Sequence, residues 1–192
     1  MSVFAMYIDR AEEFYIEGKG NELIATTRKG RSVSVSSINN DKFGLLQDNS
    51  NISNGDLVTN IKTGIKYFVI GKQRSTDAVQ VQLSKCNATV DIVRLAKQYI
   101  NGNYTGHSIE QLLHSNVPAI YQDITGKMQQ FDSGLLSTST RRFILPGLSD
   151  VMLLDRIKLN SDNGQVDVIN TSMYENLHYI QISSDKRRVV SS

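Results

Sequence analysis

The sequence predicts a mainly β protein of two small β-barrel-like modules in tandem, with an N-terminal α-helix and a short linker helix. The main observation is an internal repeat, because residues 56–84 and 155–183 follow one pattern at a spacing of 99 positions. Each copy reads as a short strand, a polar turn, a second strand, a polar loop and a third strand, which is a β-meander. The apolar positions coincide, with Val58, Val69, Val81 and Leu83 falling on Ile157, Val168, Ile180 and Ile182. We therefore expect both copies to bury the same side in the same register, because a one-residue slip would turn every side chain over.

Composition limits the class of protein. The 192 residues are 40% hydrophobic, and 21 Lys and Arg oppose 19 Asp and Glu, so the net charge of +2 gives no electrostatic reason to bind nucleic acid. Cys86 is the only cysteine, which excludes an intramolecular disulfide and a multi-thiolate metal site. No apolar run approaches the roughly 18 residues that span a bilayer, so we expect no membrane partner. The N-terminal MSVFAMYIDR lacks the order of a signal peptide, which fits assembly in the cytosol.

Residues 3–16 are predicted to form an amphipathic α-helix that ends at Gly18 and Gly20. Its apolar residues recur at helical spacing at Phe4, Ile8, Ala11 and Tyr15. Two roles remain open for it. It could cap the first module, or it could dock on a neighbouring subunit through Phe4, Ile8 and Tyr15.

The predicted domain organisation is a first module with its helix over 1–95, a linker over 96–116, and a second module with the C-terminal tail over 117–192. Within the first module, a strand over 31–38 follows a hairpin turn at Lys29-Gly30. The linker carries one short helix over 108–114, with Ser108 as its N-cap. In the second module, Asn163-Gly164 is typical of a type I′ hairpin turn.

Two long polar segments, 39–54 and 123–139, are predicted to be exposed loops. Their apolar and basic residues are candidates for subunit contact or for lining a lumen: Phe43, Leu45, Leu46, Lys127, Leu135 and Leu136. Exposed aliphatic residues would form a patch of the kind that monomers avoid. Because surface loops tolerate changes of length, we expect deletion of 126–134 to leave the module folded.

Catalytic and metal-binding motifs are absent from the sequence. The three histidines lack the HExxH spacing, no GxxxxGK[ST] phosphate loop is present, and no serine lies in GxSxG. We therefore expect no enzyme activity, no catalytic residue, no metal and no cofactor. A different possibility is a basic and aromatic face that binds single-stranded nucleic acid through Tyr67, Phe68, Lys72 and Arg74. Adjacent strand residues point to opposite sides, so only one of the two aromatic residues could join such a face.

The order of segments in the second half resembles the head-closure proteins, also called stopper or neck proteins, of tailed bacteriophages. These segments are VPAIYQD, DSGLLSTSTRRFILPG, DRIKLNSDNGQVDVIN and LHYIQISSDKR, with matching pieces GDLVTNIKTGIKYFVIGK and VQLSKCNATVDIVRL in the first half. The resemblance covers roughly residues 55–95 and 116–188. The chain departs from the family pattern at Leu154, where glycine is usual, and at Asp167, where an apolar residue or tyrosine is usual.

The resemblance implies a non-enzymatic ring subunit of the virion, assembled in the bacterial cytoplasm and placed between the portal and the tail. Its partners would be further copies of itself, portal or adaptor proteins, tail proteins, and the double-stranded DNA that passes through the channel during ejection. The near-neutral charge agrees, because dense lysine and arginine would hold the phosphates of passing DNA. Two alternatives stay open: a tail or baseplate adaptor, and a single-stranded nucleic-acid-binding β-barrel module.

Overall fold

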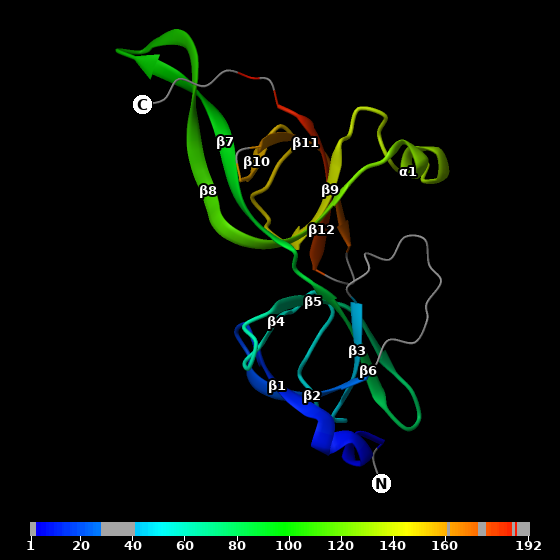
Figure 1. The fold of residues 1–192 in the computed structure, drawn as a ribbon. Coiled ribbons are helices and arrows are strands. Elements are labelled where there is room, and N and C mark those ends of the chain that lie inside the picture. Colours follow the sequence, from blue (N-terminus) through cyan, green and yellow to red (C-terminus); the bar gives the residue numbers. More distant parts are fainter. Residues whose placement is uncertain (1–2, 28–40, 161, 173–175, 186, 188–192) are drawn as a thin grey trace. The chain divides into compact units, whose positions relative to one another are not determined.

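The protein is mainly β and contains two closed six-stranded antiparallel barrels (Figure 1). The computed structural model describes residues 3–27, 41–160, 162–172, 176–185 and 187. The predicted strand over 31–38 and its Lys29-Gly30 turn lie outside these residues. The chain divides into one unit of Met1–Cys86 with Ser172–Leu177 and a second unit of Asn87–Thr171 with His178–Ser192. The predicted fold class, two tandem barrels, is therefore confirmed.

The first barrel has the strand order β1-β2-β3-β6-β5-β4 and closes through pairing of β1 with β4. Its strands are β1 (Ala11–Ile16), β2 (Gly20–Thr27), β3 (Asp41–Leu46), β4 (Leu57–Asn60), β5 (Lys66–Arg74) and β6 (Val79–Lys85). Inward-facing strand residues, together with Ile52 between β3 and β4, form one core: Phe14, Ile16, Ile24, Leu46, Ile52, Val58, Tyr67, Val69, Val79, Val81 and Leu83. A 3-10 helix, η1 (Val3–Arg10), precedes the barrel and buries Phe4 against Ala25, Leu45 and Ala78.

The second barrel has the order β10-β11-β12-β9-β8-β7 and closes through pairing of β10 with β7. Its elements are β7 (Ala88–Ile100), β8 (Asn103–Asp123), the helix α1 (Gly126–Phe131), β9 (Arg141–Pro146), β10 (Arg156–Leu159), β11 (Asp162–Ser172) and β12 (Leu177–Ser184). The core consists of Val90, Ile92, Val117, Ala119, Phe143, Leu145, Val151, Ile157, Val166, Ile180 and Ile182.

The two barrels share one topology, since the six strands of each follow the same order around the barrel. The buried residues Val58, Val81 and Leu83 match Ile157, Ile180 and Ile182 on the same side, as the repeat predicts. The register of 99 is wrong for the middle strand, where Val69 corresponds to Val166. The Val69 amide donates to the Asp56 carbonyl at 2.9 Å, and the Val166 amide donates to the Asp155 carbonyl at 2.8 Å. The turn between β10 and β11 is two residues shorter, and a shift of two keeps the same side inward.

The predicted α-helix over 3–16 is wrong in type and in length. The helical segment is a 3-10 helix that ends at Arg10, and residues 11–16 form β1. Phe14 and Ile16 lie in the core while Tyr15 is exposed, which is the two-residue period of a strand. Pairing with both β2 and β4 satisfies the backbone of this segment and overrides its local helical spacing.

The predicted linker over 96–116 and its helix over 108–114 are also wrong. These residues lie in β7 and β8, a continuous antiparallel pair of the second unit, and β7 starts at Ala88. The hairpin turns at Asn101-Gly102, where both φ angles are positive (51° and 80°), as a type I′ turn requires. The turn expected at Asn163-Gly164 is wrong as well, since Gly164 pairs with Ile157 inside the barrel wall.

Candidate functional site: the hairpin arm and its base

The strands β7 and β8 continue beyond the barrel as a two-stranded hairpin (Figure 1). β10 pairs with β7 only at Asp91, Ile92 and Val93, so β7 residues beyond this point pair with β8 alone. We call the part from Leu95, opposite Glu110, to the turn at Asn101-Gly102 the arm. Neither strand of the arm contributes to the barrel core.

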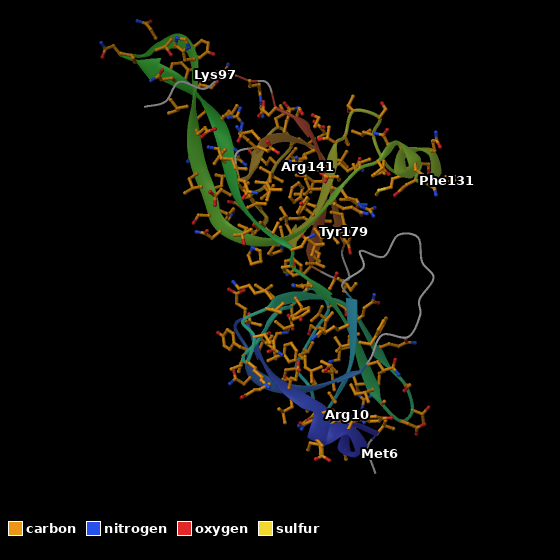
Figure 2. All side chains as sticks on the ribbon, in the orientation of Figure 1. Met6, Arg10, Lys97, Phe131, Arg141 and Tyr179 are labelled. Carbon is orange, nitrogen blue, oxygen red and sulfur yellow. The ribbon has the colours of Figure 1, made fainter. Side chains whose placement is uncertain are left out.

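The end of the arm carries an apolar surface. Tyr99, Ile100 and Tyr104 are each more than half exposed, and the two tyrosine rings lie 5.8 Å apart. The Lys97 ammonium lies 5.7 Å from the centre of the Tyr104 ring, a cation–π distance. Figure 2 labels Lys97 on this hairpin. We call these four residues the arm tip. Its lysine is the only Lys, Arg, Asp or Glu between Leu95 and Ile109.

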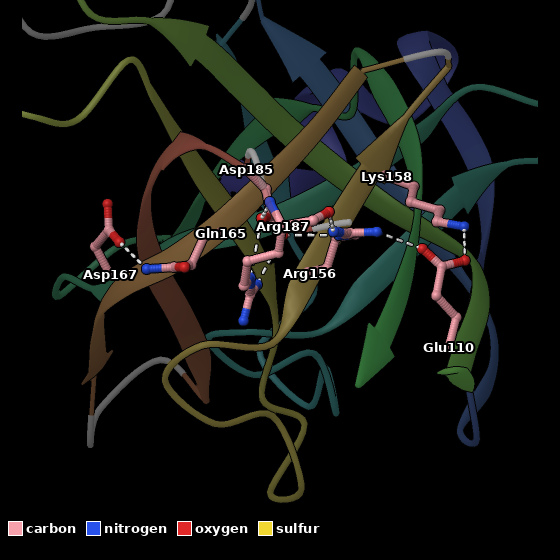
Figure 3. A network of polar contacts seen from close by, with 7 residues as sticks. All are labelled: Glu110, Arg156, Lys158, Gln165, Asp167, Asp185 and Arg187. Carbon is pink, nitrogen blue, oxygen red and sulfur yellow. Dashed lines mark hydrogen bonds and ion pairs between the residues drawn. The ribbon is translucent and has the colours of Figure 1, made fainter. Parts of the chain in front are cut away.

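A network of charged side chains fastens the arm where it leaves the barrel (Figure 3). The Arg156 guanidinium in β10 donates to Glu110 of the arm at 2.6 Å and to Asp185 at 2.7 Å. Arg156 also donates to the carbonyl of Arg187 at 2.9 Å, and Lys158 contacts Glu110. The side chains of Arg156 and Asp185 are buried, so the ion pair between them is shielded from water, whereas the Glu110 side chain is about a quarter exposed. The network ties the arm, β10 and the segment that follows β12 to one another.

The network sets the protonation of its two carboxyl groups. Burial alone would raise the pKa of Asp185, but hydrogen bonds from Arg187 and Arg156 outweigh it and hold the pKa well below its usual range. Burial likewise raises the pKa of Glu110, and hydrogen bonds from Lys158 and Arg156 bring it below its usual value. Both groups are therefore ionised at neutral pH, and both interactions with Arg156 are charge-assisted.

We call Arg94 in β7 and His114 in β8, which flank the arm in the sequence, the arm base. A second group of ion pairs joins the arm base to the loop before β10. The Arg94 guanidinium donates to both carboxylate oxygens of Asp155 at 2.8 Å and to the Asp150 carbonyl at 2.6 Å. His114 in β8 contacts the Asp150 carboxylate at 2.8 Å. The hydrogen bond to Asp155 raises the pKa of Arg94, and the contact with His114 lowers the pKa of Asp150.

The same loop exposes three consecutive apolar side chains, Met152, Leu153 and Leu154, each more than half exposed. We call these three residues the apolar loop. Leu154 has a positive φ of 70°, the left-handed region that favours glycine. The matching turn in the first barrel has Ser53 and Asn54 followed by Gly55, whose φ is 86°.

The two turns have the same hydrogen bonds. The amides of Ser53 and Met152 each donate to the carboxylate of the aspartate three residues later, at 2.7 Å in both cases. The Gly55 amide donates to the Val69 carbonyl at 2.7 Å, and the Leu154 amide donates to the Val166 carbonyl at 2.9 Å. The difference between the turns therefore lies in their side chains.

Three of the six contact residues predicted in the first half, Phe4, Leu45 and Leu46, are buried within the chain. The segment expected as a loop contains β3, which places Leu46 in the barrel core and Leu45 beside Phe4 under η1. Phe43 is half-buried in β3, opposite Gln82. The expectation that Leu45 and Leu46 are exposed is wrong, because strand pairing on both sides of β3 turns them into the protein. Ile8 and Tyr15 are exposed, although Tyr15 lies on β1.

The predicted loop over 123–139 contains α1, whose N-cap is Thr125. Lys127 and Leu136 are exposed, while Leu135 is half-buried. Gln181 holds the segment at its end, accepting from the Leu136 amide at 2.9 Å and donating to the Gly134 carbonyl at 2.7 Å. These residues belong to the second unit, whereas those predicted in the first half belong to the first unit.

The basic and aromatic face proposed for nucleic acid is not formed. Tyr67 and Phe68 are both buried, and Tyr67 packs against Phe14 in the core, so neither ring offers a stacking surface. The Lys72 ammonium donates to the carbonyls of Ser50 and Ile52. The predicted face is absent because both sides of β5 are covered at Tyr67 and Phe68, although one side of a strand in a small barrel usually faces solvent.

No group of three or more His, Cys, Asp or Glu among the described residues is placed to hold a metal ion. Burial raises the pKa of the Cys86 thiol to about 12, so its reactive thiolate form is scarce at neutral pH. A polar hollow at one end of the second barrel contains Arg141, but Asp123 and Asp162 bind this guanidinium at 3.0 and 2.8 Å.

Fold and surface together define a class of protein: a tandem closed-barrel protein with a hairpin arm. Comparison with known protein families, with curated proteins and with solved structures gave no match. No helix in the described part of the chain has the length and apolar character needed to cross a membrane. The residues of the arm tip and the apolar loop were not predicted as site residues. The Asn101-Gly102 pair between Ile100 and Tyr104 was the signal that could have revealed the arm.

Proposed function

We propose that the protein is a structural ring subunit of a bacteriophage neck, which joins the portal or head to the tail and continues or closes the DNA channel. The observation that supports this role most is the arm, a fixed hairpin that carries exposed apolar residues away from a closed barrel. The resemblance of the sequence to head-closure proteins supplies the biological setting.

The structure of the arm and its exposed apolar residues favour a role in assembly. An isolated two-stranded hairpin is at best marginally stable in water, so the arm depends on the ion pairs at its base. Those ion pairs also fix its direction. Exposed apolar residues on a directed projection are suited to contact with another protein, because monomers avoid such patches.

Barrel closure restricts how subunits can join. Closed barrels have no free strand edge, so the barrel walls cannot join by adding strand to strand. Contacts must then be made by side chains, loops and the arm. A ring that surrounds DNA also needs a surface that does not grip phosphates, and the net charge of +2 on 192 residues fits this need.

The proposal is tested by locating the protein in phage particles. Antibodies raised against the purified chain, detected by electron microscopy of particles from the phage whose genome carries the gene, should label the junction of head and tail. Labelling at the tail end would instead indicate a tail or baseplate adaptor. Absence from particles, together with strong salt-dependent binding of single-stranded DNA, would refute a structural role in the virion.

A further inference from the structure

We propose that the arm tip of one copy of the chain binds the apolar loop Met152–Leu154 of the next copy. This contact deepens the proposed function and rests on it, because a ring subunit needs two different surfaces that fit each other. A head-to-tail contact of this kind generates a closed ring when the rotation between copies closes. The second barrel carries one apolar projection and one apolar loop, which are the two surfaces required.

Leu154 is the main reason to assign a binding role to the loop. Its turn has the same hydrogen bonds as the turn around Gly55, so glycine would serve the fold equally well. The left-handed conformation is unfavourable for a residue that carries a Cβ atom. The leucine side chain is also more than half exposed, so it gains little burial within the subunit. A side chain that strains the backbone and remains in water is explained by a contact outside the subunit.

The arm tip cannot reach the apolar loop of its own chain. The loop is attached at the arm base, through Arg94 with Asp155 and His114 with Asp150. Six residues of paired strand separate Arg94 from Ile100, a span of about 20 Å at the rise of a β-strand. Because the arm is paired along this length, its tip stays away from the base, and a partner for each surface must come from another molecule.

Charge favours contact of the arm tip with the apolar loop over contact between two arm tips or between two apolar loops. The arm tip carries Lys97, and Asp150 lies two residues before the apolar loop with half of its side chain exposed. The neighbouring Arg94 is bound by both carboxylate oxygens of Asp155. Tip-to-tip contact would bring two copies of Lys97 together, and loop-to-loop contact would bring two copies of Asp150 together. Only contact of tip with loop pairs opposite charges.

The area of the contact is too small to hold an isolated dimer together. Aromatic side chains bury about 150–250 Å² each, so two half-exposed tyrosines and an isoleucine offer roughly 300 Å². A stable pair of proteins buries about 800 Å² on each partner. One tip-to-loop contact alone would thus be weak, whereas each subunit of a closed ring makes this contact twice, through its tip and through its loop.

Disulfide trapping tests the contact in the full chain. In a Cys86→Ser background, Ile100→Cys and Leu153→Cys are made as separate variants, mixed in equal amounts and oxidised at several protein concentrations. We expect the mixture to give a crosslinked dimer at several times the yield of either variant alone. A chain with both substitutions should give a ladder of multimers on a non-reducing gel. The control replaces Leu153→Cys by Ser53→Cys, an exposed position in the matching turn of the first barrel, where Ser53 corresponds to Met152.

The result that would overturn the contact is a mixture that crosslinks no more than the Ser53→Cys control. Crosslinking of Leu153→Cys only with itself would likewise overturn it, in favour of a two-fold loop-to-loop dimer. Failure here can be distinguished from failure of the proposed function. If antibodies label the neck while trapping fails, the neck role stands and this contact is wrong.

Reversal of charge gives a second, independent test of the same contact. Lys97→Glu and Asp150→Lys should each lower the crosslinking yield of the Ile100→Cys and Leu153→Cys mixture about two- to five-fold, the size expected for a surface ion pair. Combining both reversals in the same chains should restore the yield, since the opposite charges then meet again. Equal losses in the single and double reversals, with the circular dichroism spectrum unchanged, would contradict the charge pairing.

Discussion

Leu154 occupies a position at which its counterpart in the other barrel is glycine, and the two turns can be compared atom for atom. We predict that Leu154→Gly stabilises the second barrel by about 0.5–1 kcal/mol, because relief of the left-handed strain outweighs the added flexibility of the unfolded chain. Gly55→Leu should destabilise the first barrel by a similar amount. Urea unfolding followed by circular dichroism measures both changes. Equal destabilisation by the two substitutions would show that Leu154 is not strained.

Asp185 provides a prediction about acid stability. Its folded-state pKa is depressed, so its contribution to stability is present above its unfolded pKa of about 4 and is lost as the pH falls below that value. At pH 7, Asp185→Asn should cost about 3 kcal/mol, since it leaves the buried Arg156 without one of its carboxylates.

The pH dependence separates this electrostatic effect from a packing effect. The difference in unfolding free energy between the wild type and Asp185→Asn should shrink as the pH is lowered from 5 to 2. Asp162→Asn is the matched control, because Asp162 lies on the exposed surface and pairs with Arg141. A difference that stays constant over this pH range would contradict the charge interaction as its cause.

Within the strands, the two barrels fill matching core positions with different volumes. In the first barrel, Ile24 is large and Gly44 is small, and a Cβ added to Gly44 would lie 2.4 Å from Ile24 Cγ2. The register places Ala119 and Phe143 at the corresponding positions of the second barrel. The large and the small residue have thus exchanged places between the barrels. Because the core is closely packed, the size of one residue in each pair limits the size of the other.

A double-mutant cycle tests this exchange of volumes. Gly44→Phe should cost about 3 kcal/mol or more by overpacking, and Ile24→Ala about 2–4 kcal/mol by leaving a cavity. The double variant should be less destabilised than the sum of the single variants by about 1–3 kcal/mol. Unfolding curves of the four proteins measure the coupling. Simple additivity would show that the two side chains do not share this space.

How far an element could be predicted depended on whether local and long-range preferences agreed. The repeat predicted both barrels, because its strands alternate and its turns are polar. The arm was missed because Ser108 and Gln111 fit a helix cap, whereas pairing with β7 decides the structure. β3 was missed because it contains Gly44, a residue type that is rare inside strands, and this glycine is explained only by Ile24 on the neighbouring strand β2. The arm tip was not predicted as a site because its residues come from two strands, which lie side by side only in the folded hairpin.

The helix α1 and its flanking loop remain suited to a change of length. None of the side chains of α1 is buried, and Phe131 is one of the most exposed apolar residues described. Deletion of 126–134 should therefore leave the second barrel folded, with a change in unfolding free energy within about 1 kcal/mol. Circular dichroism and urea unfolding check this, and loss of cooperative unfolding would show that the segment is part of the barrel. A role of this loop in gating the channel stays a prediction, tested by the DNA content of particles that carry the deletion.

At the scale of the whole molecule, the repeat describes two barrels, and the first has the means to fold alone. All six strands of the first barrel lie between Ala11 and Lys85, and its core cluster draws every buried member from this range. Closure through β1 and β4 leaves no strand that needs a partner from the other unit. We therefore predict that residues 1–86 fold in isolation, although a chain of this size buries a smaller share of its surface than a larger domain.

The fragment of residues 1–86 should show the circular dichroism of a β protein, dispersed amide signals in NMR spectra and one cooperative urea transition. The variant Leu46→Ala, which opens a cavity in its core, should lower the midpoint, with a loss of about 2–5 kcal/mol. An unfolded fragment, or one insensitive to Leu46→Ala, would mean that the first barrel requires residues from the remainder of the chain.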